Sequence, residues 1–306
     1  KEWFQDMPVD KLAKVLHHVS EFALELDCPE LYQAYLKEDI SIFMRDYWRR
    51  NGFPEMNTDC IPDRLYIGNQ FCHLLFPEEQ CLFDLMEKAH REKRSITLVY
   101  TYIREDMLKT TEELLAKVDN WCRKKQISAE IVVNDWAMIK MLEIYPERLI
   151  PVLGTLLNKR KKDPRMKYKK GDRMLYEENS LNAEFYREFL GKQCNIWRYE
   201  WESCGYAQKF PDSLNGKNSL HVPFYQTNTS QYCPLYAVCT ERERGKQKLV
   251  TNCPYFCEQK ALLYPKHLHM VGRYNSLFGI DTEMLQHPEK LEVYVTAGID
   301  RLVLGL

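Results

Sequence analysis

Residues 96–134 read ITLVYTYIREDMLKTTEELLAKVDNWCRKKQISAEIVVN and set the architecture of the whole chain. Short apolar runs open and close this segment at residues 96–102 and 130–134, as two buried strands would. Between them, residues 106–125 have the spacing of an amphipathic helix. The apolar face of that helix carries Leu108, Leu114, Leu115, Val118 and Trp121. A strand, a helix and a second strand form the repeating unit of a parallel α/β fold.

The same alternation continues in both directions along the chain. Further candidate strands lie at residues 65–71, 149–153, 195–201, 220–224, 267–271 and 301–304. Eight strands joined by crossovers predict an α/β fold of the TIM-like (β/α)8 barrel type. The fourth crossover carries a basic insertion at residues 159–170. In the sixth crossover, a cysteine module at residues 226–260 is expected to replace the helix.

The N-terminal part of the chain has a different character. Apolar side chains from Leu12 to Leu26 fall at helical spacing, and a second helical stretch, residues 31–50, stops at the breaker pair Asn51-Gly52. We therefore expect a helical N-terminal extension over residues 1–62 and the barrel over residues 63–306. The extension either caps the barrel or docks a partner subunit.

Composition limits the class of protein. Of the 306 residues, 45% are hydrophobic and 28% are charged, which is an ordinary balance for a globular protein. The net charge of −1 gives no general reason to expect nucleic acid or an anionic membrane as a partner. The apolar runs are too short for a membrane span. No signal peptide opens the sequence, which predicts a cytoplasmic protein. Eleven cysteines, an odd number, then predict reduced or metal-bound thiols and no disulfide framework.

Four cysteines cluster near the C-terminal end and form the most informative motif. Cys233, Cys239, Cys253 and Cys257 read Cys-Pro-x4-Cys-x13-Cys-Pro-x2-Cys. Thiolates at this density select zinc, copper(I) or an iron–sulfur cluster. Structural zinc sites usually pair cysteines two to four residues apart, which only Cys253 and Cys257 satisfy. Iron–sulfur ligation accepts wider spacing, and the third interpretation is a set of unrelated thiols.

Cys72 adds a fifth cysteine to this count. It directly follows the first candidate strand, at the rim where barrel enzymes build their active sites. Five cysteines thus compete for four ligand positions.

Three other residues are candidates for proton transfer. Asp135 follows the third strand and either handles a proton or caps the helix that starts at Trp136. Glu200 shares one strand face with Glu202, so both side chains point into the barrel or both point outward. His221 lies in the sixth strand as an acid–base group or as a hydrogen-bonded core residue. Nucleotide-binding loops and the serine and zinc protease signatures are missing from the sequence.

Four segments occur in an order that resembles a known family. They are residues 63–72, 132–136 and 151–165, followed by the cysteine module. Together they resemble the peptidase U-32 family, the collagenase-like peptidases, and within it the UbiU and UbiV type of iron–sulfur protein. The resemblance covers residues 63–306 and leaves the N-terminal part unexplained.

This resemblance implies a TIM-like barrel that holds one [4Fe–4S] cluster on four cysteines. Proteins of the UbiU and UbiV type form a heterodimer that serves oxygen-independent hydroxylation in anaerobic ubiquinone synthesis. Other members of the family hydroxylate RNA bases without oxygen, and some members were named as peptidases. For this chain the resemblance implies a second U-32-type subunit as partner, in a heterodimer or homo-oligomer, and a small molecule or RNA as substrate. The alternatives are zinc as the metal, a non-catalytic partner subunit, and a collagenase-like peptidase.

The ligand set can be carried over residue by residue. One version of the family motif matches Cys72, Cys239, Cys253 and Cys257, with one extra residue in the longer gap. A different version, in which a Cys-Pro precedes the last pair, includes Cys233. The resemblance therefore implies Cys239, Cys253 and Cys257 as ligands and leaves the fourth position open between Cys72 and Cys233.

Overall fold

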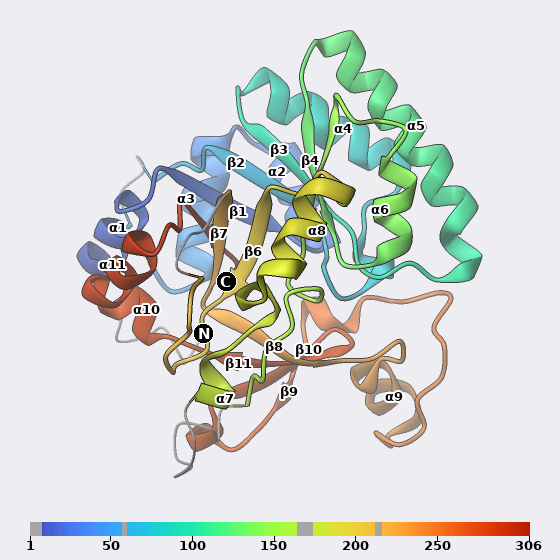
Figure 1. Ribbon diagram of the computed structural model, residues 1–306. Helices are drawn as coiled ribbons and strands as arrows, with labels where there is room; N and C mark the ends of the chain where they lie inside the picture. Colours follow the sequence, from blue (N-terminus) through green and yellow to red (C-terminus); the bar gives the residue numbers. More distant parts are fainter. Residues whose placement is uncertain (1–7, 57–59, 164–173, 212–215) are drawn as a thin grey trace.

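Eight of the described strands close into a parallel barrel at the centre of the molecule (Figure 1). The computed structural model describes residues 8–56, 60–163, 174–211 and 216–306. The order around the barrel is β1-β12-β7-β6-β5-β4-β3-β2, and neighbouring strands are parallel. The strands are β1 (Glu21–Leu26), β2 (Arg64–Gly68), β3 (Ser95–Val99), β4 (Ala129–Val133), β5 (Leu149–Leu153), β6 (Arg198–Glu202), β7 (Lys217–Val222) and β12 (Arg301–Leu304). The predicted TIM-like barrel is confirmed.

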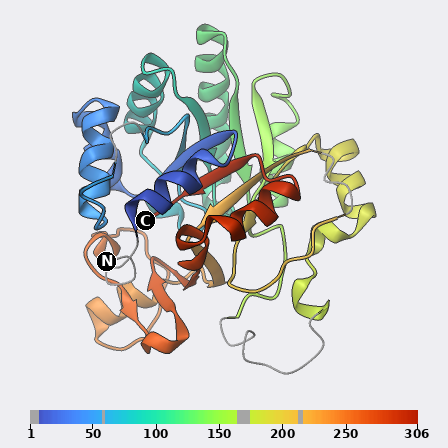
Figure 2. The ribbon, with the colours of Figure 1, turned by 90° about the vertical axis from the view of Figure 1, so that its left-hand side faces the viewer.

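Helices cover the outside of this barrel. They are α1 (Val9–His17), α2 (Pro29–Lys37), α3 (Ile40–Arg50), α4 (Glu79–Arg91), α5 (Leu108–Lys125), α6 (Trp136–Leu142), α7 (Met174–Glu177), α8 (Glu184–Cys194), α10 (Glu283–Gln286) and α11 (Pro288–Thr296). On α5, Leu115 and Val118 of the predicted apolar face are buried, and Cys122 is buried beside them. Figure 2 shows α1 lying beside α10 and α11, so the first and last helices meet on one side of the barrel.

The prediction of a helical extension over residues 1–62 is wrong at its centre. The expected helical stripe ends with α1 at His17, and Glu21–Leu26 forms strand β1, which pairs with β12 on one side and β2 on the other. A strand buried on both faces reads as a nearly continuous apolar run, and such a short run cannot be distinguished from a helical stripe. The barrel therefore begins at residue 21, and the expected boundary at residues 62 and 63 falls inside it.

The predicted strand at residues 267–271 does not belong to the barrel. Its first part forms a 3-10 helix, Lys266–Leu268, and its end belongs to β10 (Met270–Arg273). This strand lies in a separate four-stranded antiparallel sheet, ordered β8-β11-β10-β9, here called the small sheet. Its other strands are β8 (Phe224–Thr229), β9 (Leu262–Leu263) and β11 (Ser276–Ile280). A short apolar run does not reveal which sheet it joins, and β1 supplies the missing barrel strand.

The long crossover from β7 to β12 contains the small sheet, the helix α9 (Pro234–Glu241), and then α10 and α11. The cysteine module is therefore added to this crossover and does not replace its helix. Figure 1 shows the small sheet and α9 together at the lower end of the barrel. Tyr102, just beyond β3, donates a hydrogen bond to the carbonyl oxygen of Ser230 at 3.1 Å, and Asn275 donates to the carbonyl oxygen of Phe71 at 2.7 Å. The small sheet thus covers the C-terminal ends of β2 and β3. In the basic insertion, residues 164–170 lie outside the described residues.

Candidate functional site

The fold brings Cys72 to the cysteine module. Cys72 follows β2 and belongs to the end of the barrel that the small sheet covers. Cys72, Cys257 and Tyr255 all pack against the same apolar cluster. That cluster consists of Leu75, Val271, Tyr274, Phe278 and Ile280. Two cysteines far apart in the sequence therefore lie beside the same cluster at the barrel rim.

The thiols of this group lie close enough to affect one another. Burial raises the pKa of Cys72 to about 12, and charges on Cys233 and Cys253 act in the same direction. Burial also raises the pKa of Cys257 to about 12, with contributions from Cys72, Cys253 and Cys233. Neighbouring thiolates repel one another, so a cation bound among them would stabilise their charged forms.

Nearby backbone N–H groups partly offset the effect of burial on the pKa of two of these thiols. Those of Leu74 and Leu75 act on Cys72, and that of Tyr255 acts on Cys253, in each case lowering the thiol pKa against the larger effect of burial. Hydrogen bonds of this kind favour the thiolate form, and they also tune metal-bound sulfur.

Cys233 has a different role from its neighbours. Its Sγ accepts a hydrogen bond from the backbone N–H of Tyr236 at 3.3 Å and thereby caps α9. The same Sγ donates to the carbonyl oxygen of Tyr274 at 3.1 Å. The thiol therefore already has both a donor and an acceptor partner. Cys239 lies farther along α9, near enough for its charge to act on Cys233.

Cys28 is a neighbour of this group that the sequence analysis did not single out. It follows β1 as Cys72 follows β2, and it packs against the same apolar cluster. Burial, reinforced by the charge of Asp27, raises its pKa. The sequence did contain a signal for this position, because a cysteine just after a barrel strand belongs to the rim. The signal could be used only if residues 21–26 were recognised as a strand.

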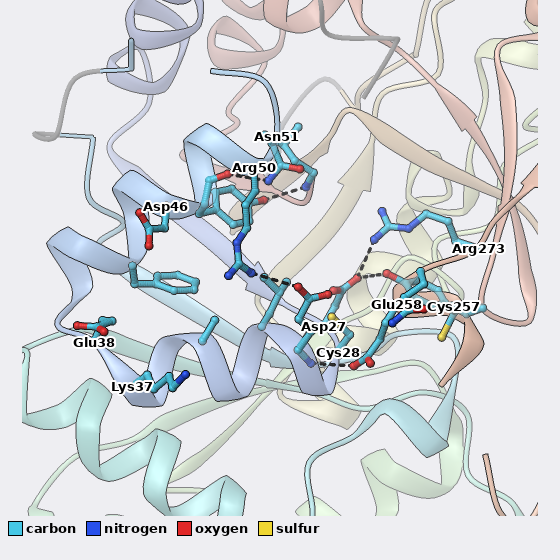
Figure 3. A pocket seen from close by; sticks show the side chains of 18 residues that line it. Asp27, Cys28, Lys37, Glu38, Asp46, Arg50, Asn51, Cys257, Glu258 and Arg273 are labelled. Atoms are coloured by element: carbon cyan, nitrogen blue, oxygen red, sulfur yellow. Dashed lines mark hydrogen bonds and ion pairs between the residues drawn. The ribbon is translucent and has the colours of Figure 1, made fainter. Parts of the chain in front are cut away.

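A cavity of about 830 Å³ lies beside Cys28 and Cys257, between α2, α3 and the module (Figure 3). Its charged groups are largely paired with one another. Arg50 binds Glu30 at 3.1 Å, and Arg273 lies 3.7 Å from Asp27. The carboxylate of Glu258 accepts the backbone N–H of Glu30 at 2.8 Å. These bonds hold α2 and α3 against the cysteine module.

The described residues contain no group of three or more His, Cys, Asp and Glu side chains already arranged to hold a metal ion. The cysteines converge at the rim, but their sulfur atoms are not in ligating geometry. Binding of a metal would therefore require the side chains to turn toward a common centre. Coupling between metal binding and local folding is usual for thiolate sites.

His221 and Glu200 lie together inside the barrel. Glu200 is fully buried, so the alternative in which it points outward is excluded. His221 Nε2 lies 2.5 Å from Glu200, and Nδ1 lies 2.7 Å from Glu25 on β1. Burial alone would lower the pKa of His221, but hydrogen bonds and charges from Glu200 and Glu25 raise it to about 10. At neutral pH this residue is an imidazolium held between two carboxylates.

This charged group continues toward the base of the barrel. Tyr66 donates to Glu200 at 3.0 Å and accepts from Arg301 at 2.8 Å. Arg301 in turn binds Glu130 at 2.6 Å. Glu202, on the same inward face as Glu200, forms an ion pair with Lys162 and accepts the backbone N–H of Gln226 at 2.6 Å. Every one of these charges has an opposite partner, as buried charges require.

The mouth of the barrel above His221 is nearly filled. Only about 30 Å³ remains among Glu25, Glu202, His221 and the covering Tyr274 and Phe278. That space suits a water molecule or two and no substrate. In this conformation Glu200 and His221 are therefore inaccessible to a substrate.

Asp135 adopts the capping alternative. Its Oδ1 accepts the backbone N–H of Ala137 at 2.7 Å, which caps α6, and Oδ2 accepts the N–H of Ile103 at 3.3 Å. Both carboxylate oxygens thus bind backbone groups of two neighbouring rim loops. The geometry gives Asp135 a structural role at the rim.

Comparison with known proteins identifies no relative: no family model, no curated protein and no solved structure matches the chain. No helix in the described ranges combines the length and apolar character that a bilayer crossing demands.

Proposed function

We propose that the protein is an iron–sulfur barrel protein, an enzyme or enzyme subunit of the U-32 type, that serves an oxygen-independent hydroxylation or a related redox step. The observation that carries this proposal is the convergence of Cys72, from the end of a barrel strand, on the cysteines of a separate module. Unrelated core thiols have no reason to gather at one rim from such distant segments of the chain.

The cluster that we propose is [4Fe–4S], held by Cys72, Cys239, Cys253 and Cys257. Cys72 is preferred to Cys233 because the Sγ–H of Cys233 donates to the carbonyl oxygen of Tyr274, and a thiolate ligand would lose that bond. When bound, such a cluster supplies electron transfer or an iron position open to an oxygen-bearing molecule. The chain supplies the thiolates and aromatic neighbours such as Tyr255 that limit access of water. We place the protein in a reducing compartment such as the cytoplasm, where thiols of this kind stay unbridged.

A non-catalytic, cluster-bearing subunit is the second candidate function. The filled barrel mouth favours it, because Glu200 and His221 are closed off from any substrate. Its partner would be a second U-32-type chain, as the resemblance implies. A hydroxylation activity of the isolated chain would exclude this role.

A collagenase-like peptidase has less support. A cysteine protease needs a histidine beside its nucleophile. His73, the sequence neighbour of Cys72, instead has its Nε2 at 2.6 Å from Arg104 Nη1. Neither Cys72 nor any of the module thiols, Cys233, Cys239, Cys253 and Cys257, has a hydrogen bond to an imidazole among those that the described residues make.

Anaerobic purification with metal and sulfide analysis tests the proposal. We expect a brown protein with about four irons and about four sulfides per chain, as the cluster formula requires. A colourless protein with one zinc per chain would contradict the iron–sulfur cluster and support zinc as the metal. Protein free of both metals after anaerobic reconstitution would overturn the metal site altogether.

A further inference from the structure

A cavity of about 780 Å³ lies at the end of the barrel that faces away from the small sheet (Figure 1). We call it the base cavity. Its lining comes from the N-terminal ends of the strands β2 to β7, whereas Cys72 and the cysteine module belong to the opposite end. Its volume is within the range of small-molecule sites. The proposed redox function makes no use of this end of the barrel.

Positively charged side chains dominate the polar part of this lining. The cations are Arg64, Lys93, Arg94, Arg198 and Lys217. Among the lining residues that the structure describes, Glu130 alone carries a carboxylate. A cavity lined mainly by one sign of charge concentrates ions of the opposite sign.

Part of this charge is already balanced by a network of ion pairs at the floor of the cavity. Three arginines there have one carboxylate each: the pairs are Arg64–Glu21 at 2.7 Å, Arg198–Asp300 at 2.8 Å and Arg301–Glu130 at 2.6 Å. The network as a whole is therefore neutral. The excess positive charge of the base cavity comes from the remaining three cations, Lys93, Arg94 and Lys217.

These three cations form no ion pair with a carboxylate in the described part of the chain. Lys93 and Lys217 are exposed, and the ammonium group of neither has a partner there. Arg94 binds only backbone carbonyl oxygens, that of Glu92 through Nε at 2.8 Å and that of Pro62 through Nη1 at 3.0 Å. The guanidinium is thus held in place, and its Nη2 is left for a ligand.

The three cations stand on two sides of the barrel opening. Lys93 and Arg94 directly precede β3, and Lys217 is the first residue of β7, which lies across the barrel from β3. Strand alternation places Lys217 on the same face as His221, which points into the barrel. A ligand in the base cavity is therefore flanked by positive charge on both sides.

The rest of the lining is apolar. This wall consists of Ile96, Ile127, Ile150, Pro151 and Val152. A bare inorganic anion would leave the wall in contact with water. An organic group attached to the anion would cover it, which is the usual division of a small-molecule site into an apolar body and a few polar contacts.

We propose that the base cavity binds a phosphate-bearing organic molecule. The phosphate group binds Lys93, Arg94 and Lys217, and the organic body lies against the apolar wall. A phosphate carries close to two negative charges near neutral pH and three acceptor oxygens, so it matches several cationic donors better than a carboxylate does. Because the cavity lies far from Cys72, this molecule is not the substrate of the cysteine centre, and the inference does not depend on the proposed redox function.

Titration calorimetry of the full chain with three probes tests this inference. The probes are phenyl phosphate, inorganic phosphate and phenol, and the ionic strength is kept low because salt screens exposed cations. We expect phenyl phosphate to bind with a Kd of about 1 mM or tighter, and inorganic phosphate and phenol to bind at least about tenfold more weakly, since each supplies one half of the contacts.

Two variants and a control locate the bound probe. The double variant Lys93→Gln/Lys217→Gln removes two cations that form no bond within the described residues, and should weaken the binding of phenyl phosphate at least about tenfold. Ser128→Trp, at an exposed lining position before β4, should abolish binding by filling the cavity. Lys109→Gln removes one positive charge from a side chain on α5 that is 89% exposed and does not line the cavity, and should leave the affinity unchanged.

Three results would overturn the inference. The first is no binding of phenyl phosphate up to about 10 mM, a range that includes even weak specific sites. The second is equal affinity for phenyl phosphate and inorganic phosphate, because the apolar wall would then take no part. The third is unchanged affinity in both the double variant and Ser128→Trp, because the probe would then bind elsewhere.

Discussion

His221 is the residue whose environment departs most from what its sequence position suggests. It is buried inside the barrel between Glu25 and Glu200, and Tyr66 packs edge-on against its ring with centroids 5.8 Å apart. The two carboxylates overcome the effect of burial and keep the imidazole charged. Alternation along the strand indicated that Glu200 and Glu202 share one face, but the direction of that face and the partner Glu25 depended on the closure of the barrel.

The free energy of unfolding should therefore decrease at alkaline pH, because His221 loses its proton there. Its folded pKa of about 10 lies above the ordinary value of 6.5, so its contribution to the free energy of unfolding is complete below about pH 6.5 and is lost as the pH rises to about 10. Chemical denaturation from pH 6 to pH 10.5 measures this loss. We expect wild type to lose more stability over this range than His221→Gln, because the variant has no imidazole to deprotonate.

His17→Gln, which changes an exposed histidine on α1, serves as the matched control and should follow the wild type. If wild type and His221→Gln lose stability in parallel, the charged imidazole is not part of the native barrel.

At the scale of elements, the small sheet is the feature that distinguishes this barrel. It closes the mouth above His221 and carries the residues that face Cys72 and Cys257. Its strands β8 and β11 meet closely at Gly279, where a Cβ atom would lie 2.0 Å from Cζ of Tyr225. Glycine is required at this position because the Tyr225 ring occupies the space of a side chain.

Gly279→Ala should therefore destabilise the small sheet. Overpacking of this kind typically costs about 1–3 kcal/mol, which thermal unfolding detects as a lower Tm. Gly245→Ala is the matched control, because its Cβ would meet no atom closer than 3.6 Å. Equal Tm values for the two variants would contradict the close contact between β8 and β11.

The sequence predicted most barrel strands but assigned two elements wrongly, both for the same physical reason. β1 was hidden in a helical stripe because Phe22, Ala23, Leu24 and Leu26 are all buried and leave no strand alternation. The run at residues 267–271 is equally short, and its last residues belong to an antiparallel sheet. The local sequence pattern indicates that a run is buried, but it does not indicate which neighbouring strand pairs with that run.

At the scale of the whole molecule, the fold joins segments that no local pattern connects. The rim position of Cys72 followed from its place after a strand, and its meeting with the module was implied only by resemblance. The cap formed by Cys233 and the proximity of Cys28 became visible only in three dimensions, because they depend on α9 and β1. A metal centre on these thiolates would tie the barrel to its long crossover, so loss of the metal should loosen the small sheet and α9 together.

Iron and sulfide content of Cys72→Ala after anaerobic purification tests this account most directly, beside Cys233→Ala and the control Cys194→Ala at the end of α8. We expect Cys72→Ala to lose the cluster, and both Cys233→Ala and Cys194→Ala to keep about four irons per chain, as a [4Fe–4S] centre requires. An intact cluster in Cys72→Ala would contradict the account, because the centre would then belong to the module alone and not to the barrel rim.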